Sequence, residues 1–533
     1  MVSRPHCRCS DIRTIAVVAL CVAFAEGSRS FAQVNVLTYH NDNARSGQNL
    51  QETILTPANV NQAQFGKLFH QRVDGFVYAE PLYVSNVAIP GKGFHNVVYV
   101  ATEHDSVYAF DADSNAGSNA KPLWETRFAG GGMRPVPSRD VACTDLVPEI
   151  GITGTPVIDA TTGTLYVVVK TKENHTYMQR LHALDISTGQ EKLGGPVVIS
   201  TSVPGNGDGS NAGVVSFDPL LENQRAGLLL TDGIVYVAWA SHCDNNPYHG
   251  WVMGFDAATL SLVAAFNSTP DGGLGGIWQG GAGLSADASG AIYFGTGNGT
   301  FDADVGGRDF GDSLVKLSLG GGLTVADYFT PTNQSDLNSG DNDFGSSGAL
   351  LLPDQPGGHA HLAVICGKEG KIYVVDRDNM GHFNPTDDSQ IVESIPGAVS
   401  SCYGGPAYWN GTVYYGSASD ALKAFALSGG LLSATPTSAT ADIFGFPGVS
   451  PTISANGTAN GIVWVLERSY SGHFPSVVLH AYDATDMSQE LYNSTEAAHR
   501  DVAGQSVKFV PPTVANGKVY VAAHRRIAVY GLL

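Results

Sequence analysis

The architecture of this chain can be inferred from four residues, Gly233-Ile234-Val235-Tyr236, because their pattern returns along the sequence. In each copy a glycine precedes an apolar run that has an aromatic residue in the third place after it. Five further copies are Gly163-Thr164-Leu165-Tyr166, Gly290-Ala291-Ile292-Tyr293, Gly411-Thr412-Val413-Tyr414, Gly461-Ile462-Val463-Trp464 and Gly517-Lys518-Val519-Tyr520. Two looser copies are Asn96-Val97-Val98-Tyr99 and Leu362-Ala363-Val364-Ile365. Self-similarity of this kind indicates a repeat architecture.

Each copy is expected to form part of a β-hairpin. After a polar turn, most copies are followed by a second apolar strand that closes on an acidic residue, as in Tyr373-Val374-Val375-Asp376. A short segment upstream, such as Thr153-Gly154-Thr155-Pro156-Val157-Ile158, predicts another strand with its turn. The copies are roughly 50 to 70 residues apart, which is long enough for a four-stranded sheet and a loop.

The repeat predicts an all-β fold, an eight-bladed β-propeller of four-stranded antiparallel blades. Closing such blades into a ring protects the edges of their strands, whereas helical repeats would need a 3.6-residue rhythm that is missing here. The last copy is too short to complete a blade. We therefore expect the segment 35–70 to supply a strand that closes the ring against residues 519–533, within a single propeller domain of residues 33–533.

The net charge limits the partners of the protein, and the beginning of the sequence indicates export. A formal net charge of −20 disfavours binding to nucleic acids or to anionic lipid, because no basic stripe offsets the repulsion. Three early arginines, an apolar stretch at 14–25 and Ser30-Phe31-Ala32 predict a cleaved signal peptide over residues 1–32, and hence a periplasmic or secreted protein. That stretch is too short to cross a bilayer, and no later segment is longer, so no membrane span is expected.

Four cysteines lie beyond the predicted signal peptide, namely Cys143, Cys243, Cys366 and Cys402. In an oxidising compartment they allow up to two disulfides, with three pairings open. A bond between Cys143 and Cys243 is favoured, because both residues lie in loops of neighbouring copies that should face the same axis.

Polar residues that could bind a ligand or take part in catalysis are expected where loops from several blades converge on the propeller axis. Four segments depart from the repeat by carrying such residues. They are Ala240-Ser241-His242-Cys243-Asp244-Asn245-Asn246, Gly276-Ile277-Trp278-Gln279, Thr296-Gly297-Asn298-Gly299-Thr300 and Gly340-Asp341-Asn342-Asp343-Phe344-Gly345.

Together with the repeats, these segments resemble the pyrroloquinoline quinone (PQQ)-dependent alcohol dehydrogenases over nearly the whole chain beyond residue 32. Residues 54–60 look like that family's lead-in to the first blade. The most similar stretch is Gly276-Ile277-Trp278, followed some twenty residues later by Tyr293-Phe294-Gly295-Thr296-Gly297-Asn298. The resemblance implies that Trp278 is the floor beneath the quinone and that Asn298 is a calcium ligand.

The resemblance assigns roles to four more residues. Asp341 would act as the general base and touch the metal, and Asp343 would be the second acid that lanthanide-using members carry. Asp244, or Asn245 after a shift of one residue, lies where the family has a glutamate ligand, and Lys368 lies where a basic residue contacts the quinone. Oxygen atoms of this kind suit a hard cation.

The implied function is that of an exported oxidoreductase, which oxidises an alcohol or sugar hydroxyl with PQQ and a Ca²⁺ or lanthanide ion. No Cys-x-x-Cys-His motif for covalent haem is present, so electrons would leave to a separate acceptor.

Two departures from the family pattern lie beside the expected cofactor. The family has two adjacent cysteines followed by an aspartate and an arginine, whereas this chain has Cys143 alone and Glu149 in the place of the arginine. A glutamate there would repel the carboxylates of PQQ. The departures favour an alternative, a cofactor-free PQQ-like propeller that binds another protein or a polysaccharide.

Each of these residues also has a purely structural interpretation. Trp278 could pack between blades, Asp341 and Asp343 could belong to a solvated loop, and Lys368 could be a surface turn residue. Acidic residues in glycine-rich turns are most often turn formers, and that interpretation competes with a cation loop at Asp302, Asp304, Asp309 and Asp312.

His242 and His249 flank Asp244, and a zinc site there competes with a hydrogen-bonded loop because a fourth ligand at suitable spacing is missing. The sequence contains no motif of a serine hydrolase, zinc protease or phosphate-binding loop.

Overall fold

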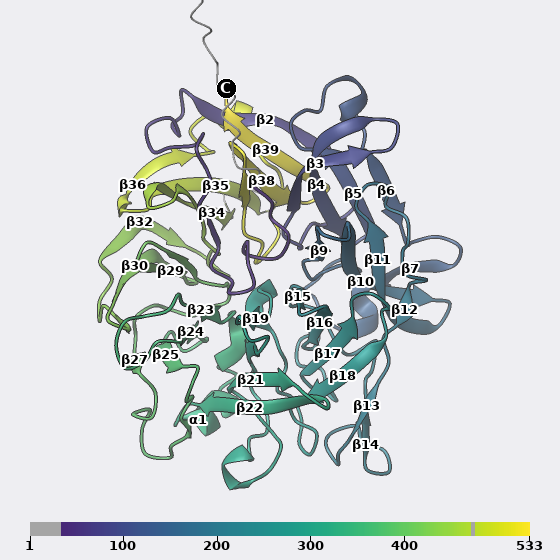
Figure 1. Cartoon of the computed structure of the whole chain (residues 1–533), viewed down its shortest axis with the longest axis vertical. Coiled ribbons are helices and arrows are strands. Elements are labelled where there is room, and N and C mark those ends of the chain that lie inside the picture. The colour runs from purple at the N-terminus through teal and green to yellow at the C-terminus, as the bar shows by residue number, and fades with distance from the viewer. Residues whose placement is uncertain (1–33, 471–474) are drawn as a thin grey trace, which may run out of the picture. The chain divides into compact units, whose positions relative to one another are not determined.

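Eight small antiparallel sheets follow one another around a ring in the computed structural model of the chain (Figure 1). The structure describes residues 34–470 and 475–533, and residues 34–533 form one compact unit. The predicted eight-bladed β-propeller is confirmed, while the predicted signal peptide lies outside the described residues. None of the described helices is long and apolar enough to span a membrane.

The first four blades each contain four strands in chain order. They are β3 (Leu82–Ile89), β4 (Gly93–Thr102), β5 (Ser106–Asp111) and β6 (Trp124–Arg127); β9 (Val157–Asp159), β10 (Thr164–Glu173), β11 (Thr176–Asp185) and β12 (Val197–Val198); β15 (Leu229–Thr231), β16 (Ile234–Trp239), β17 (Trp251–Asp256) and β18 (Leu262–Asn267); and β19 (Ser285–Ala286), β20 (Ile292–Gly295), β21 (Leu314–Leu319) and β22 (Leu323–Thr330).

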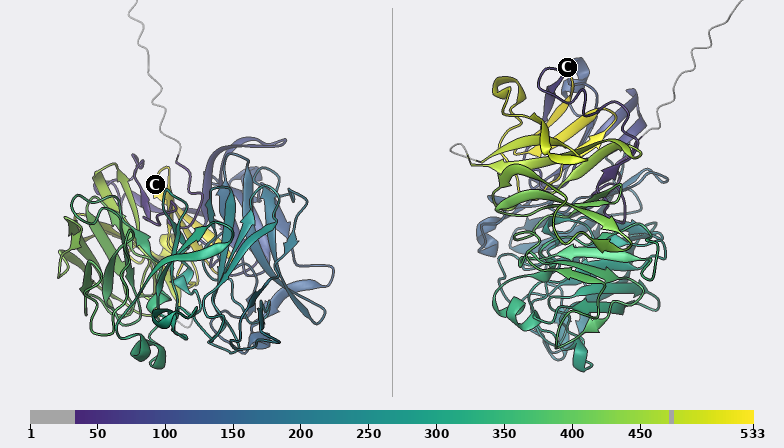
Figure 2. Two further views of the ribbon diagram at one scale, coloured as in Figure 1. Left: turned by 60° about the horizontal axis from the view of Figure 1, so that its bottom comes forward. Right: turned by 90° about the vertical axis from the view of Figure 1, so that its left-hand side faces the viewer.

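Blades five to seven repeat the arrangement. They are β23 (Leu350–Leu351), β24 (Leu362–Cys366), β25 (Ile372–Asp376) and β27 (Glu393–Ile395); β28 (Ala407–Trp409), β29 (Thr412–Gly416), β30 (Asp420–Ser428) and β32 (Ser438–Phe444); and β33 (Thr452–Asn456), β34 (Ala459–Ser469), β35 (Ser476–Asp483) and β36 (Asp486–Asn493). The colours in Figure 2 show that the blades follow the order of the chain around the ring.

Additional elements lie outside this scheme. They are β1 (Gln48–Asn49), β7 (Met133–Pro137), β8 (Glu149–Ile150), the hairpin of β13 (Ser202–Pro204) and β14 (Val214–Ser216), β26 (His382–Phe383), β31 (Leu431–Leu432), and the helices α1 (Gln334–Ser339) and α2 (Ala498–Asp501).

The eighth blade joins the two ends of the described chain. It contains β37 (Thr513–Ala515), β38 (Lys518–Ala523) and β39 (Arg526–Leu532), and its outermost strand is β2 (Phe65–Arg72). β2 pairs antiparallel with β39, from Phe65 opposite Leu532 to Arg72 opposite Arg526 (Figure 1). The predicted closure of the ring by an early strand is therefore confirmed, and it leaves no blade incomplete.

The middle strands of the blades are apolar on both faces. All five residues of β24 are buried, and so are the first five residues of β17. A blade packs against a neighbour on each side, so both faces of its middle strands lose contact with water. This explains why the repeat appears in the sequence as short continuous apolar runs rather than as alternation.

The acidic residues at the ends of the repeats are turn formers. The Oδ1 atom of Asp111 accepts hydrogen bonds from the backbone N–H groups of Asp113 and Ser114. Asp185 and Asp256 make the same bonds in the next two blades. An aspartate that bonds the backbone two and three residues later stabilises a tight turn, so these repeated carboxylates have a structural role.

A stretch that precedes the first blade, residues 36–49, runs inside the ring and is called the axial segment here (Figure 1). It hydrogen bonds to the first strand of every blade, in chain order, through the atom pairs Val36 N and Tyr83 O (2.8 Å), Leu37 O and Ile158 N (2.8 Å), Asn43 Nδ2 and Leu230 O (2.9 Å), Asn43 O and Ala286 N (2.8 Å), Ala44 O and Leu351 N (3.0 Å), Ser46 O and Tyr408 N (2.8 Å), Gly47 O and Ile453 N (2.7 Å), and Asn49 Nδ2 and Val514 O (3.1 Å). It therefore gives hydrogen-bond partners to the inner edge of each blade.

Arg45 is the central side chain of the axial segment. It is buried, and its guanidinium donates hydrogen bonds to the carbonyl of Leu284 at 2.8 Å, the hydroxyl of Thr38 at 2.7 Å and the carbonyl of Tyr39 at 2.9 Å. Burial lowers the pKa of Arg45 to about 10, so the side chain is charged at neutral pH. A side chain at Gly283 would collide with this guanidinium, so the segment packs directly against the loop that follows Trp278.

Candidate functional site

A cavity of about 290 Å³ lies where loops from seven blades converge. Its lining residues are Asp145, Asn223, Arg225, Ser241, His242, Cys243, Asp244, Trp278, Gly280, Asp341, Asp343, Ser346, Lys368, Tyr403, Phe446, Lys508 and Phe509. They come from connections between strands, such as those from β16 to β17, β22 to β23 and β24 to β25. The cavity is therefore built on the propeller axis by segments far apart in the sequence.

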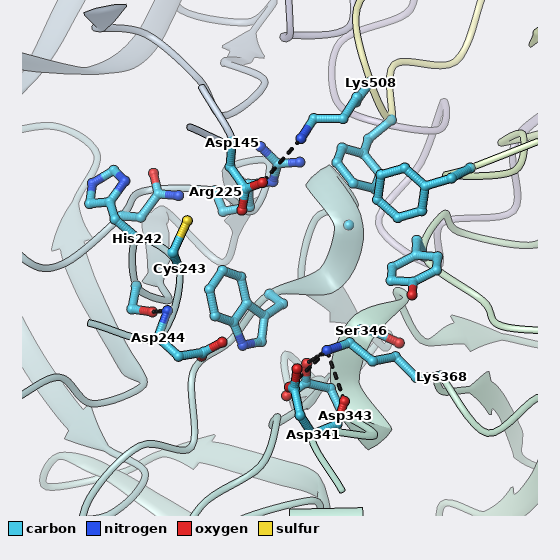
Figure 3. A pocket seen from close by; sticks show the side chains of 17 residues that line it. Asp145, Arg225, His242, Cys243, Asp244, Asp341, Asp343, Ser346, Lys368 and Lys508 are labelled. Atoms are coloured by element: carbon cyan, nitrogen blue, oxygen red, sulfur yellow. Dashed lines mark hydrogen bonds and ion pairs between the residues drawn. The ribbon is translucent and has the colours of Figure 1, made fainter. Parts of the chain in front are cut away.

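Apart from Asp244, the acidic residues, lysines and arginine of the cavity fall into two groups (Figure 3). Arg225 and Lys508 lie together with Asp145 at one end, and Asp341, Asp343 and Lys368 lie at the other. A ligand that spans the cavity would thus meet mainly cations at the first end, called the Arg225 end here. At the second end it would meet two carboxylates and an ammonium.

Lys368 is held between the two predicted acidic residues. Its Nζ lies 2.9 Å from Oδ1 of Asp341 and 2.7 Å from Oδ2 of Asp343. Burial opposes the charge of Lys368, but the Asp343 and Asp341 carboxylates outweigh it and raise its pKa. Burial raises the pKa of Asp343, and Lys368 opposes that shift. The side chain of Asp341 is 63% exposed and that of Asp343 only 5%, so Asp341 is the accessible acid.

Trp278 and Asp244 line the cavity, and Asn298 lies beside it. The backbone N–H of Asn298 donates to Oδ1 of Asp343 at 2.8 Å, and a side chain at Gly297 would collide with that carboxylate. The amide oxygen of Asn298 and the indole N–H of Trp278 are buried without a hydrogen-bond partner among the described residues. The structure thus brings these residues close to the predicted acids, with polar atoms left unpaired.

The three predicted carboxylate ligands do not converge on one point in the described chain. Among the described residues, three oxygens taken one each from Asp244, Asp341 and Asp343 do not all lie within 4.8 Å of one another. Asp244 accepts a hydrogen bond from the Tyr248 hydroxyl at 2.5 Å, and the Lys368 ammonium binds both other carboxylates. Ca²⁺ and lanthanides are held by several converging oxygens, so three carboxylates that do not converge, two of them bonded to an ammonium, do not fit such an ion.

We expect that Ca²⁺ and Tb³⁺ do not bind in the cavity and do not change the melting temperature of the protein. The Lys368 ammonium already forms ion pairs with both acids, so a cation would have to displace it. The check is a titration with Tb³⁺ that follows tryptophan-sensitised luminescence, together with the melting temperature in EDTA and in excess Ca²⁺. Saturable luminescence that disappears in an Asp343→Asn variant would contradict the expectation.

The predicted disulfide between Cys143 and Cys243 is present, with a Cα–Cα distance of 5.6 Å. It joins the loop between β7 and β8 to the loop between β16 and β17 and lies at the cavity wall through Cys243. Glu149 lies elsewhere, because its carboxylate bonds Nδ1 of His104 at 2.8 Å and does not line the cavity. The expected repulsion between Glu149 and a ligand in the cavity is therefore removed by its position.

The competing cation sites are hydrogen-bonded loops. His249 bonds the Thr269 hydroxyl and the carbonyl of Asp208 through its two ring nitrogens. The Asp302 carboxylate accepts a hydrogen bond from the backbone N–H of Asp309, and the Asp309 carboxylate accepts one from the backbone N–H of Asp271. These contacts support the interpretation of both segments as loops that their own side chains stabilise.

Arg225 is the functional candidate that the repeat pattern did not reveal. Its side chain is 7% exposed, lines the cavity and lies with Cζ 4.4 Å from the ring centroid of Phe509. No described residue accepts a hydrogen bond from its guanidinium, and burial lowers its pKa. The polar run Glu222-Asn223-Gln224-Arg225, directly before the buried residues 226–229, is the signal in the sequence that could have indicated it.

No family model matches the sequence, and no curated protein matches it. Among solved structures, the quinohemoprotein alcohol dehydrogenase ADHIIG from Pseudomonas putida HK5 is similar, with a TM-score of 0.59 and 15% identity over 94% of this chain and 80% of that chain. This chain has the propeller fold of that dehydrogenase. The resemblance inferred from the repeats is thereby confirmed at the level of the fold, which is all that this identity shows.

Two other propellers are more distant. BamB from Moraxella catarrhalis has a TM-score of 0.47 and 14% identity, over 88% of this chain and 97% of that chain. Sqt1 from Saccharomyces cerevisiae has a TM-score of 0.46 and 12% identity, over 88% of this chain and 99% of that chain. Scores of this size support no functional inference, and the function has to be argued from the cavity.

Proposed function

We propose that this chain is an exported quinoprotein-like oxidoreductase whose axial cavity binds a small, planar, carboxylate-bearing molecule without a divalent cation. PQQ is the first candidate, because it is planar and has three carboxylates. The observation that carries the proposal is Arg225, a largely buried residue whose guanidinium faces the cavity and makes no hydrogen bond to a described residue. Asp145 and Glu103 offset only part of the burial penalty on Arg225, and a ligand carboxylate would offset more of it.

The residues of the Arg225 end would hold the carboxylates. Arg225 can make two parallel hydrogen bonds to a carboxylate, and Lys508 lies beside it in a 3.4 Å ion pair with the exposed Asp145. The aromatic side chains of Trp278 and Phe509 also line the cavity and supply apolar surface for a flat ring.

At the opposite end, the chain offers a base and a cation for a substrate hydroxyl. Asp341 has the accessible carboxylate and would accept the proton of an alcohol or sugar hydroxyl. Lys368 would donate a hydrogen bond to a neighbouring oxygen while it keeps Asp343 ionised. A bound quinone supplies the acceptor for two electrons, which the protein residues cannot provide themselves.

The Cys143–Cys243 disulfide supports the location. Structural disulfides form and persist in oxidising compartments, so the bond agrees with a periplasmic or secreted protein.

The test is a titration of the purified protein with PQQ in EDTA, followed by quenching of tryptophan fluorescence and by calorimetry. The proposal expects saturable binding at one site, and dye-linked oxidation of alcohols or sugars by the loaded protein. Binding that requires added Ca²⁺ would contradict the metal-independent site, and no binding in either condition would overturn the proposal. Binding without turnover would leave a quinone-binding protein and refute the oxidoreductase.

The second candidate function is a cofactor-free propeller that binds a protein or a polysaccharide. The observation in its favour is that the predicted metal ligands are not assembled, with Asp244 bonded to Tyr248 and Lys368 bonded to both acids. The same titration separates the two functions, because the scaffold requires that PQQ does not bind.

A further inference from the structure

A buried lysine contacts the cavity through a histidine. Lys170, in β10 of the second blade, is 2% exposed, and its Nζ lies 2.8 Å from the carbonyl oxygen of Leu220 and 3.0 Å from that of Glu222. Its third neighbour is Nε2 of His242, at 2.8 Å. His242 lines the cavity, and no described residue bonds its other ring nitrogen, Nδ1. Lys170 itself is not among the lining residues.

The hydrogen count fixes the tautomer of His242. An ammonium has three hydrogens and no acceptor, and carbonyl oxygens only accept. With Leu220, Glu222 and His242 as the three neighbours, the Lys170 ammonium is fully used only if Nε2 of His242 accepts. The ring hydrogen must then be on Nδ1. Burial, with Lys170 and Arg225 nearby, holds the pKa of His242 well below its usual range, so the ring is neutral.

We propose that Lys170 is a positioning residue, which sets whether His242 presents a hydrogen-bond donor or an acceptor to a ligand in the cavity. With Lys170 charged, Nδ1–H of His242 is a donor for a carboxylate or carbonyl oxygen. With Lys170 neutral, its two hydrogens remain on the two carbonyls and its lone pair accepts from Nε2–H of His242. Lys170 releases one proton to solvent, the imidazole hydrogen moves from Nδ1 to Nε2, and Nδ1 becomes an acceptor.

The change is expected near neutral pH. Burial lowers the pKa of Lys170 to about 7, against the opposing effect of Glu222, Asp218 and Glu103, which face it. Below pH 7 the pair therefore presents a donor, which suits an anion, and above pH 7 it presents an acceptor. Because an anion prefers the protonated pair, its affinity falls as the pH rises through 7, and a bound anion raises the pKa of Lys170 in return.

This inference rests on the proposed function for its ligand, but its central test needs no ligand. Histidine labelled with ¹⁵N reports the tautomer through the chemical shifts of both ring nitrogens, and a His242→Gln variant assigns the signal. We expect the hydrogen on Nδ1 at pH 6 and on Nε2 at pH 8. A hydrogen on Nε2 at pH 6, or a tautomer that does not change between these pH values, would overturn the proposal.

Variants separate positioning from mere packing. Lys170→Met keeps the apolar stem and is expected to abolish the pH dependence of the His242 signal, whereas Lys170→Arg stays charged and should keep Nδ1–H at pH 8. The control is Lys316→Met, because Lys316 also donates to a backbone carbonyl, that of Arg377, but lies away from the cavity. An unaltered pH dependence in Lys170→Met would refute the role. If that variant does not fold, the wild-type pH series still decides.

A second readout uses PQQ as the probe. We expect its affinity to fall about tenfold from pH 6 to pH 8 in the wild type and to change less in Lys170→Met, because one charge-assisted hydrogen bond is lost. If PQQ fails to bind while the tautomer changes, the proposed function fails and the role of Lys170 stands. If PQQ binds but the tautomer of His242 does not change with pH, the proposed role of Lys170 fails and the proposed function stands.

Discussion

Replacing Arg225 with methionine is expected to weaken PQQ binding by roughly 10- to 100-fold, because a charge-assisted hydrogen bond contributes about 1.5–3 kcal/mol. The same change should leave the unfolding temperature unaltered or raise it. Arg225 is largely buried and makes no hydrogen bond to a described residue, so its removal ends a desolvation cost and breaks no hydrogen bond, while methionine keeps apolar contact with the Phe509 ring in place of the guanidinium. The measurements are calorimetric titration with PQQ and thermal unfolding without ligand.

Arg308→Met is the matched control for this prediction. The guanidinium of Arg308 lies 2.7 Å from Oδ2 of Asp271, is largely exposed and does not line the cavity. The Arg308→Met variant should bind PQQ with the affinity of the wild type. Wild-type affinity in Arg225→Met would refute the anion site, and a large loss of stability would show that Arg225 has structural partners instead.

The second large effect is expected in the axial segment, where Arg45→Met should lower the free energy of unfolding by about 1–3 kcal/mol for each buried acceptor that loses its donor. Removing the guanidinium leaves the carbonyls of Leu284 and Tyr39 and the hydroxyl of Thr38 buried without their donor. These acceptors belong to the loop beneath the cavity and to the segment itself. Unfolding in urea, with an unchanged m-value, measures the loss.

Arg308→Met again provides the comparison, because an exposed ion pair contributes about 0–1 kcal/mol. A loss of less than about 1 kcal/mol in Arg45→Met would show that water or rearranged neighbours satisfy the freed carbonyl groups. In that case Arg45 would not hold the axial segment to the blades.

The fold could be predicted from the sequence because its determinants are local and repeated. A run such as Gly233-Ile234-Val235-Tyr236 forms a middle strand whose faces are both buried, and each copy repeats the same local physics. The closing strand could be predicted from the incomplete last copy. The axial segment could not, because it bonds to the blades mainly through backbone atoms of Asn43, Ala44, Ser46 and Gly47, which leave no pattern of side chains.

The candidate site was predictable only in part. Trp278, Asp341, Asp343 and Lys368 belong to motifs, and the structure places all four at one cavity. How they pair depends on distances between loops of different blades, and no spacing in the sequence reports that the Lys368 ammonium lies between the two acids.

Sequence motifs also misplaced Glu149 and missed Arg225. Aligning motifs put Glu149 beside the ligand, but its partner is His104. Arg225 stands outside every motif and nevertheless lines the cavity. A single residue in a loop carries no periodicity, so its direction is set by tertiary packing alone.

The axial segment has a consequence for the order of events during synthesis. Residues 36–49 leave the ribosome before any blade, yet their last partner, Val514, belongs to the eighth blade and is made after the other seven. The pairing of β2 with β39 has the same long separation along the chain. Contacts between such distant residues make folding slow, so the end of the axial segment and the strand β2 must wait for their partners in the eighth blade. The ring can therefore close only after blade eight has been made. A nascent chain that stops earlier keeps unpaired strand edges, which promote aggregation.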